Sequence, residues 1–283
     1  MANEQKTGLQ VFNQAITSPA TQKYLEDVLG ERKGSFVNNL TALVANNAAL
    51  QACQPFTIMF AALKATALNL PLENSLGMAY CIPYKDNKKN ITVAQFQLGY
   101  KGFKQLALRS GQFAVIPNAT DIKEGELKSR NRLTGECVFE FIEDDASRAK
   151  AKTIGYASYF RLLNGAESTF YMSVEEMEAH ALRYSQTYRS KYDNVKQQSK
   201  WTTDFDDMAK KTVIKLNLSK NAPLSVEMQD AIKADQSIQY EANKYEYLDN
   251  NDIQQQMVDA QKAQEVANLF ADFNAPEEKK DNK

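Results

Sequence analysis

The chain has 283 residues, of which 43% are hydrophobic and 24% are charged, and its formal net charge is -1. This apolar content lies above that of disordered chains and predicts a folded protein with a substantial core. No apolar run approaches the roughly 18 residues of a membrane-spanning helix. The first residues also lack the apolar segment of a secretory signal. We therefore expect a cytoplasmic protein that makes no membrane contact.

Charge is distributed unevenly along the chain. Residues 227–283 hold 6 Lys or Arg and 13 Asp or Glu, whereas residues 1–226 hold 28 basic and 22 acidic residues. A basic body followed by an acidic tail is common among nucleic-acid-binding proteins. A solvated tail without a specific partner gives the same pattern.

The cysteines and the single histidine do not form a metal-binding pattern. Cys53, Cys81 and Cys137 are odd in number and far apart in apolar surroundings. We expect buried thiols rather than disulfides or zinc ligands. His180 has no CxxC partner and is predicted to lie on a helix surface. We expect no metal site and no cofactor.

The first part of the chain is predicted to be helical. Residues 1–16 are polar and weakly periodic, and we expect them to be disordered. Ser18 followed by Pro19 marks the start of the first helix. Two further helices are predicted over residues 36–49 and 58–68, where apolar residues recur at helical spacing.

The next segment changes to strands. Residues 78–84 and 91–98 are predicted to form an antiparallel hairpin with a basic tip. A short helix over residues 100–110 follows directly. Its apolar face is expected to hold it to the sheet, while Lys101 and Lys104 occupy another face.

The second half of the chain mixes strands and helices. An Asn164-Gly165 turn is typical of a two-residue hairpin, and Ser173 with Glu176 forms a capping-box pattern at a helix start. Residues 183–203 are polar and are expected to form a loop. The predicted strands cover residues 113–118, 138–142, 153–163 and 168–172.

A strong helix is predicted over residues 205–220, with Asp204 as its N-cap. Lys211 and Lys215 are one turn apart and are expected on its outer side. The inner stripe is expected to consist of Phe205, Met208, Thr212 and Leu216.

These elements predict an α+β fold in which a twisted antiparallel sheet and hairpins are backed by helices. An N-terminal helical region and a flexible or helical acidic C-terminal tail complete it. We expect a disordered segment over residues 1–16, a core over 17–234, and an acidic tail over 235–283 that can bind a partner.

Two enzyme classes can be tested against the sequence. No G-x-x-x-x-G-K-[ST] motif occurs, so an ATP-driven motor is not predicted. A metal-dependent nuclease remains an alternative, using Asp204 with Asp207 or Asp121 with Glu126, because such sites need converging carboxylates. Asp204 also suits a helix cap, and Asp207 can pair with Lys211 one turn later. A structural protein that assembles without DNA is a third alternative.

Two segments concentrate positive charge with aromatic rings between the charges. Residues 85–132 hold ten basic and four acidic residues, and residues 183–220 hold nine and four. Lysines neutralise phosphates and release counterions, and aromatic rings stack bases without regard to sequence. Both segments therefore favour nucleic-acid binding, although solvated faces and core packing also use such residues.

Five blocks of sequence, taken in order, resemble one protein family. They cover residues 79–84, 95–111, 155–157, 175–180 and, above all, 201–213, which reads WTTDFDDMAKKTV. Over roughly residues 20–230 the chain resembles the RecT family of phage and prophage single-strand annealing proteins.

This resemblance implies a function without catalysis. The protein is expected to bind single-stranded DNA and to pair complementary strands without nucleotide hydrolysis, so it is not expected to be an enzyme. It is expected to form homo-oligomeric rings or helical filaments on single-stranded DNA and on the annealed duplex. A phage exonuclease and the host single-strand-binding protein are the expected partners, in the cytoplasm of a bacterial host cell.

The resemblance also implies a basic groove that binds DNA. One wall is expected to carry Gln95, Gln97, Tyr100, Lys101, Lys104 and Arg109, and the other Lys210, Lys211 and Lys215. The hairpin tip is expected to add Lys85, Lys88 and Lys89. The polar segment over residues 183–203 is expected to add Arg189 and Lys191.

Overall fold

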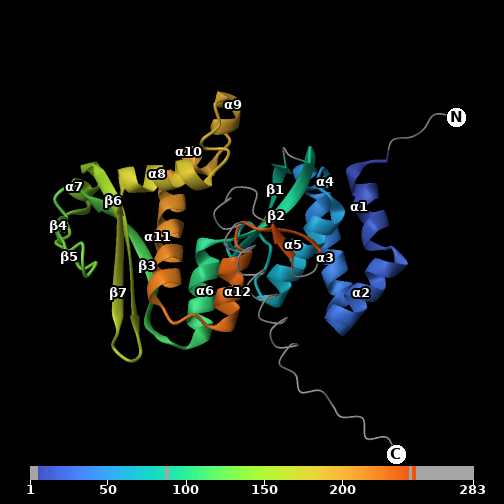
Figure 1. The fold of residues 1–283 in the computed structure, drawn as a ribbon, viewed down its shortest axis with the longest axis horizontal. Coiled ribbons are helices and arrows are strands. Elements are labelled where there is room, and N and C mark those ends of the chain that lie inside the picture. The colour runs from blue at the N-terminus through green and yellow to red at the C-terminus, as the bar shows by residue number, and fades with distance from the viewer. Residues whose placement is uncertain (1–5, 87–88, 242–243, 247–283) are drawn as a thin grey trace, which may run out of the picture.

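The structure is a computed structural model that describes residues 6–86, 89–241 and 244–246. A helical lobe from the first part of the chain lies beside a strand-rich lobe from the second part (Figure 1). The described strands pair antiparallel, so the predicted α+β class is confirmed. No helix among the described residues is long and apolar enough to cross a membrane.

The helical lobe begins earlier than the sequence predicted, because residues 8–16 form a helix and are not disordered. Thr7 caps this helix in a capping box with Gln10, and Phe12 and Ile16 are buried in the main core. Two apolar residues one turn apart are enough to dock a short helix. The lobe consists of α1 (Gly8–Ile16), α2 (Pro19–Leu29), the 3-10 helix η1 (Gly30–Arg32), α3 (Lys33–Ala45), α4 (Ala48–Gln51) and α5 (Pro55–Ala67).

Replacing Phe12 by alanine tests whether α1 belongs to the core. Phe12 is 1% exposed, so Phe12→Ala should lower the free energy of unfolding by about 3–5 kcal/mol. The neighbouring Val11 is 43% exposed, and Val11→Ala should change stability by less than about 0.5 kcal/mol. Urea unfolding measures both variants. Equal stability of the two would show that α1 is not docked.

The predicted hairpin is confirmed. β1 (Ala79–Asp86) pairs with β2 (Ile91–Leu98), and Ala79 lies opposite Leu98. The hairpin packs against α5. It therefore ties the helical lobe to the elements that follow.

The helix after the hairpin, α6 (Tyr100–Ser110), lies unusually close to the chain that leads into β1. A Cβ added to Gly102 would lie 2.1 Å from the carbonyl oxygen of Met78, and one added to Gly99 would lie 2.1 Å from that of Gly77. Only glycine fits such an approach of two backbones. These glycines fix the direction in which α6 leaves the hairpin.

The strand-rich lobe is built on a three-stranded sheet in the order β3-β6-β7. The Asn164-Gly165 turn joins β6 to β7 as predicted, with Gly165 at φ +86°. α11 packs against all three strands and α8 packs on β6 and β7. The elements are β3 (Phe113–Lys123), β4 (Leu127–Arg130), β5 (Cys137–Phe139), α7 (Asp145–Lys150), β6 (Thr153–Leu162), β7 (Glu167–Ser173), α8 (Val174–Tyr184), α9 (Asp193–Lys196), α10 (Lys200–Thr203) and α11 (Phe205–Asn221).

Several details of this lobe differ from the predictions. β4 and α7 were not predicted, and the expected loop over 183–203 contains the short helices α9 and α10. Asp204 occupies the N-cap position of α11, but its side chain makes no capping hydrogen bond. The apolar face of α11 is formed by Ala209, Val213, Ile214 and Leu218, so it is shifted by about one residue from the predicted stripe.

The folded core also continues past the predicted start of the acidic tail. α12 (Val226–Ala234) leads into β8 (Ile238–Glu241), which pairs with β9 (Lys244–Glu246). Ser237 is buried, and the N–H of Phe96 donates to its carbonyl oxygen at 3.1 Å. A boundary at residue 235 is therefore too early. The rest of the predicted tail, residues 247–283, lies outside the described residues.

Candidate nucleic-acid interface

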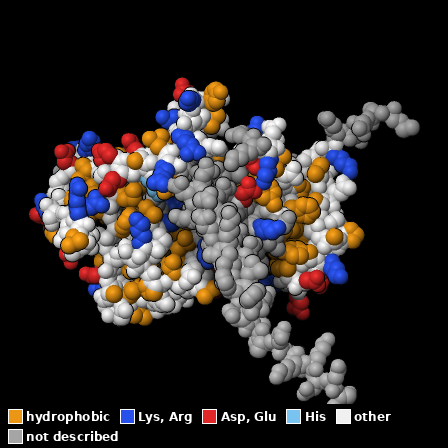
Figure 2. Space-filling model, viewed as in Figure 1, with side chains coloured by type: hydrophobic (Ala, Val, Ile, Leu, Met, Phe, Trp, Pro, Cys, Tyr) orange, Lys and Arg blue, Asp and Glu red, His pale blue; other side chains and the backbone are white. Residues whose placement is uncertain are grey.

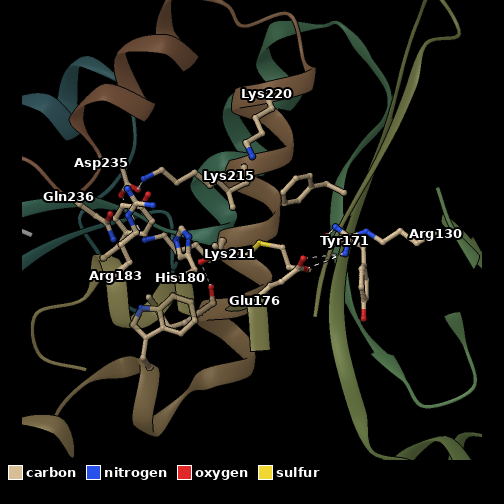
Figure 3. A pocket seen from close by; sticks show the side chains of 17 residues that line it. Arg130, Tyr171, Glu176, His180, Arg183, Lys211, Lys215, Lys220, Asp235 and Gln236 are labelled. Atoms are coloured by element: carbon tan, nitrogen blue, oxygen red, sulfur yellow. Dashed lines mark hydrogen bonds and ion pairs between the residues drawn. The ribbon is translucent and has the colours of Figure 1, made fainter. Parts of the chain in front are cut away.

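A cavity of about 740 Å³ lies between α8, α11, β7 and the junction of α12 with β8. We call it the α8–α11 cavity. Among the described residues, its lining includes five Lys or Arg and two acidic residues, and such an excess of positive charge in a concave site attracts anions. Figure 3 shows the lining side chains. The titratable lining residues are Arg130, Tyr171, Glu176, His180, Arg183, Tyr184, Lys211, Lys215, Lys220 and Asp235.

The three lysines of α11 lie at different depths in this cavity. Lys211 is buried, with its Nζ 3.8 Å from Oδ1 of Asp235. Lys215 is more open, and its Nζ is 2.6 Å from Oδ2 of the same carboxylate. Lys220 is exposed, with its ammonium 5.1 Å from the ring centre of Phe170. Positive charge thus extends from the floor of the cavity to its solvent edge.

Asp235 holds the floor of the cavity together. Its side chain is fully buried and also accepts a hydrogen bond from the N–H of Leu98 at 2.8 Å. Burial alone would raise the pKa of Asp235, but Lys211, Lys215 and the Leu98 N–H outweigh this effect and hold the pKa below its usual range. A single carboxylate therefore links α11, the end of β2 and the α12–β8 junction.

Loss of this carboxylate should be costly. Asp235→Ala leaves Lys211 buried without its partner, so we expect the free energy of unfolding to fall by about 3–5 kcal/mol. Trp201 is the only tryptophan of the chain and is buried, so its fluorescence can follow urea unfolding.

A second variant separates the lost charge pair from lost packing. Asp235→Ala combined with Lys211→Met removes the unpaired buried charge and should recover part of the stability. If the double variant were as unstable as Asp235→Ala alone, an uncompensated Lys211 charge would not be the cause.

An aromatic cluster forms another wall of the cavity. The ring centre of His180 is 4.5 Å from that of Tyr184 and 6.3 Å from that of Trp201, which in turn packs edge-on against Phe205 at 5.5 Å. The sequence predicted His180 on an open helix surface, but the structure shows it partly buried at the cavity. Burial, together with repulsion from Lys215, Lys220 and Arg183, lowers the pKa of His180 to about 4.

Arg130 and Glu176 form an ion pair at the opposite end of the cavity. Nη1 of Arg130 is 3.3 Å from Oε2 of Glu176, and its Nη2 donates to the carbonyl oxygen of Tyr171 at 3.2 Å. Glu176 also closes the predicted capping box with Ser173. This pair fixes the start of α8 against β7 and β4, so the acidic group at this end is already neutralised.

Of the predicted DNA-binding residues that the structure describes, two line the α8–α11 cavity. These are Lys211 and Lys215. Both were expected on the outer side of the helix, but Lys211 is buried and pairs with Asp235 rather than with Asp207. Lys210 lies on the same helix but is not part of the cavity lining.

The predicted residues on α6 form a smaller group at a different place. The hydroxyl of Tyr100 donates to Oδ1 of Asn118 at 2.9 Å, and Nζ of Lys104 donates to the same oxygen at 3.3 Å. The ammonium of Lys104 also lies 5.2 Å from the ring centre of Tyr100. Lys101 is exposed.

Two predicted residues make contacts within the fold: Gln95, which is buried, and Arg109, which is exposed. Gln95 is 1% exposed, and its Nε2 donates to the carbonyl oxygen of Gln236, while its own side-chain oxygen accepts from Gln97. The guanidinium of Arg109 donates to the carbonyl oxygens of Leu68 and Asn69 after the end of α5. These contacts argue against a direct role in DNA binding for Gln95 and Arg109.

The remaining predicted residues lie near the hairpin tip and α9. Lys85, Arg189 and Lys191 are exposed. Lys89 pairs with Glu246 at 2.7 Å and lies over the ring of Tyr240 at 4.0 Å, so its charge is already partly offset. Lys88 lies outside the described residues. Figure 2 shows Lys and Arg side chains over the strand-rich side of the molecule, mixed with Asp and Glu at its outer edge.

The cavity contains several residues that sequence analysis did not select. Arg183 and Lys220 are the first and last residues of the second basic segment. Their positive charge was evident from the sequence, but it did not show that they share a cavity. Arg130 comes from a strand that was not predicted, and Asp235 was assigned to the tail. Nothing in the sequence near His180 indicated that basic residues from α11 approach it.

The carboxylates of the nuclease alternative are engaged in other contacts. Asp121 lies 3.0 Å from Lys123, and the buried Glu126 lies 2.7 Å from Arg148. Asp204 lies 2.8 Å from Lys200. Within the described part of the chain, no group of three or more His, Cys, Asp or Glu side chains is arranged to hold a metal ion.

Comparison with known proteins identifies the family of this chain. The model of the RecT family matches residues 34–248. That match includes all the elements that form the α8–α11 cavity, and it extends past residue 235, in agreement with the buried position of Asp235.

Two curated relatives are similar to this chain. An uncharacterized protein of Bacillus subtilis strain 168, YqaK, is 38% identical over 257 residues, covering 89% of this chain and 83% of the relative. Protein RecT of Escherichia coli K12 is 30% identical over 199 residues, covering 66% of this chain and 65% of that protein. The chain belongs to the RecT family, and membership supports a general role in DNA recombination and single-strand annealing.

Proposed function

We propose that the protein binds single-stranded DNA in the α8–α11 cavity and anneals it to a complementary strand without ATP. The observation that carries this proposal is the gathering of five Lys or Arg, from three separate elements, beside an aromatic wall. Cations suit phosphates, and aromatic groups beside them suit bases. Family membership gives the reaction in which such binding is used.

The proposed mechanism leaves sequence recognition to the DNA. Contacts to phosphates fix the position of a strand but read no sequence, so the base edges remain available to a second strand. The protein then needs to reduce repulsion between two polyanions, and exposed charges act over about 10 Å at ordinary ionic strength. No hydrolysis step is required. The absence of a G-x-x-x-x-G-K-[ST] motif from the sequence is consistent with this mechanism.

We also propose that copies of the chain assemble into rings or helical filaments on DNA. β4 and β5 lie at one end of the molecule and α2 lies at the other (Figure 1). Large apolar side chains of these regions are exposed: Leu133 and Val138 near β4 and β5, and Val28 in α2. Exposed apolar surface at opposite ends favours head-to-tail contact between copies. Sedimentation velocity with and without an oligonucleotide tests for such assembly.

An exonuclease that exposes single strands and a single-strand-binding protein are the proposed protein partners. The excess of acidic residues over basic ones in residues 227–283 supports binding to basic surfaces of such proteins. A truncation should begin after Glu246, because residues 235–238 belong to the core. We expect truncation after this residue to spare DNA binding and to reduce recombination in cells.

A double substitution at the cavity edge tests the proposed DNA-binding site. Arg183 and Lys220 line the cavity and are exposed, so Arg183→Ala with Lys220→Ala should leave the fold intact. If both contact phosphates, affinity for a single-stranded oligonucleotide should fall. The slope of log affinity against log salt should become shallower by about 1.4, at about 0.7 per contact. Fluorescence anisotropy at several salt concentrations measures both quantities.

Lys150→Ala with Lys152→Ala provides the matched control. These lysines are exposed and lie outside the cavity lining. Their substitution removes the same net charge as the Arg183→Ala, Lys220→Ala pair. The control should keep the salt slope of the parent protein. If both pairs of substitutions changed the slope equally, binding would depend on overall charge rather than on this cavity.

Annealing itself can be followed with two complementary oligonucleotides that carry a fluorophore and a quencher. The protein should accelerate duplex formation in the presence of EDTA and without nucleotide, and the Arg183→Ala, Lys220→Ala variant should lose most of this acceleration. Acceleration that required ATP, or cleavage of the strands on addition of Mg²⁺, would contradict the proposal.

A further inference from the structure

His180 occupies a distinctive position in the α8–α11 cavity. Its imidazole lies in the cavity lining, between the ring of Tyr184 and that of Trp201. Figure 3 shows it beside Arg183 and Lys211, in the same cavity that Lys215 and Lys220 of α11 line. An anion held by those lysines would therefore lie within reach of the imidazole.

Besides Arg130 of β4 and Tyr171 of β7, the charged and titratable groups that line the cavity with His180 come from three parts of the fold. α8 contributes Glu176, Arg183 and Tyr184, and α11 contributes Lys211, Lys215 and Lys220. The α12–β8 junction contributes Asp235. Asp235 is engaged by Lys211 and Lys215, and Glu176 is engaged by Arg130.

In the free protein this environment keeps the imidazole neutral. Burial is the largest cause that lowers the pKa of His180 to about 4, and Lys215, Lys220 and Arg183 add to it by repulsion. At neutral pH the ring is therefore uncharged. A bound phosphate would offset the three cations and favour the protonated ring, which can donate hydrogen bonds from both nitrogens.

We infer that His180 takes up a proton when a phosphodiester enters the α8–α11 cavity, and that the resulting imidazolium joins Lys215 and Lys220 in holding it. This inference rests on the proposed function, because it assigns a further phosphate-binding residue within the same site. No covalent step is involved, and the proton comes from solvent.

Proton uptake on binding makes affinity depend on pH in a defined direction. The pKa of His180 is higher in the complex than in the free protein, so affinity rises as pH falls through the pKa of the complex and levels off below the pKa of the free protein. If the bound imidazole regains an ordinary pKa near about 6.5, affinity should rise about tenfold between about pH 7.5 and 5.5.

The chain offers an unusually clear test, because His180 is its only histidine. The probe is a short oligothymidylate, whose bases and phosphodiesters do not titrate in this range. Protein labelled with ¹³C-histidine gives one imidazole signal, and its NMR titration should report a higher pKa with the oligonucleotide than without it. For each protein, the affinity at pH 5.5 is divided by the affinity at pH 7.5. This ratio should be much closer to one for His180→Gln than for the parent protein.

A second variant keeps the inference testable if His180→Gln does not fold. Lys220→Ala removes one of the repelling cations, so the pKa of His180 in the free protein should rise. An imidazole titration unchanged by the oligonucleotide, or the same pH dependence of affinity in His180→Gln and the parent protein, would overturn the inference. Absence of oligothymidylate binding at every pH would instead contradict the proposed function.

Discussion

The buried carboxylate of Asp235 is the contact on which the arrangement of the cavity depends. It receives a backbone N–H from the end of β2 and the ammonium groups of two lysines on α11. A buried charge of this kind is tolerated only when it is fully paired. The pairing therefore holds the hairpin, α11 and the α12–β8 junction in one geometry, and it places the lysines at the base of the cavity.

This arrangement separates two roles for positive charge along one helix. Lys211 is mainly structural because it is buried against Asp235, whereas Lys220 is exposed at the cavity edge. Lys215 lies between these extremes: it contacts the carboxylate but also lines the open cavity. Phosphate binding would therefore draw on charges that the fold already holds in position, which reduces the cost of ordering long side chains.

Local signals in the sequence were enough to predict much of the fold. The Ser18-Pro19 helix start, the hairpin before α6, the Asn164-Gly165 turn and the Ser173 capping box all depend on residues close together in the chain, and all are present. α1 was missed because its stability comes from the burial of Phe12 and Ile16 in a core formed by later residues. The position of Asp235 was missed for the same reason, since its partner Leu98 is 137 residues away. The sequence predicted that the site would contain basic and aromatic residues. It could not predict which cations share a cavity, because that depends on this long-range packing.

The backbone contact at Gly99 and Gly102 bears on how the family is recognised. Both glycines belong to one of the long sequence blocks that first indicated RecT membership, and here they serve close packing of α6 against the approach to β1. Distant homologues found through this block would thus share the close backbone packing of α6. The block itself places no constraint on the charges of their cavity residues. If the α8–α11 cavity binds DNA as proposed, the positions equivalent to Arg183, Lys215, Lys220 and Asp235 are the ones to inspect before annealing activity is assigned to such sequences.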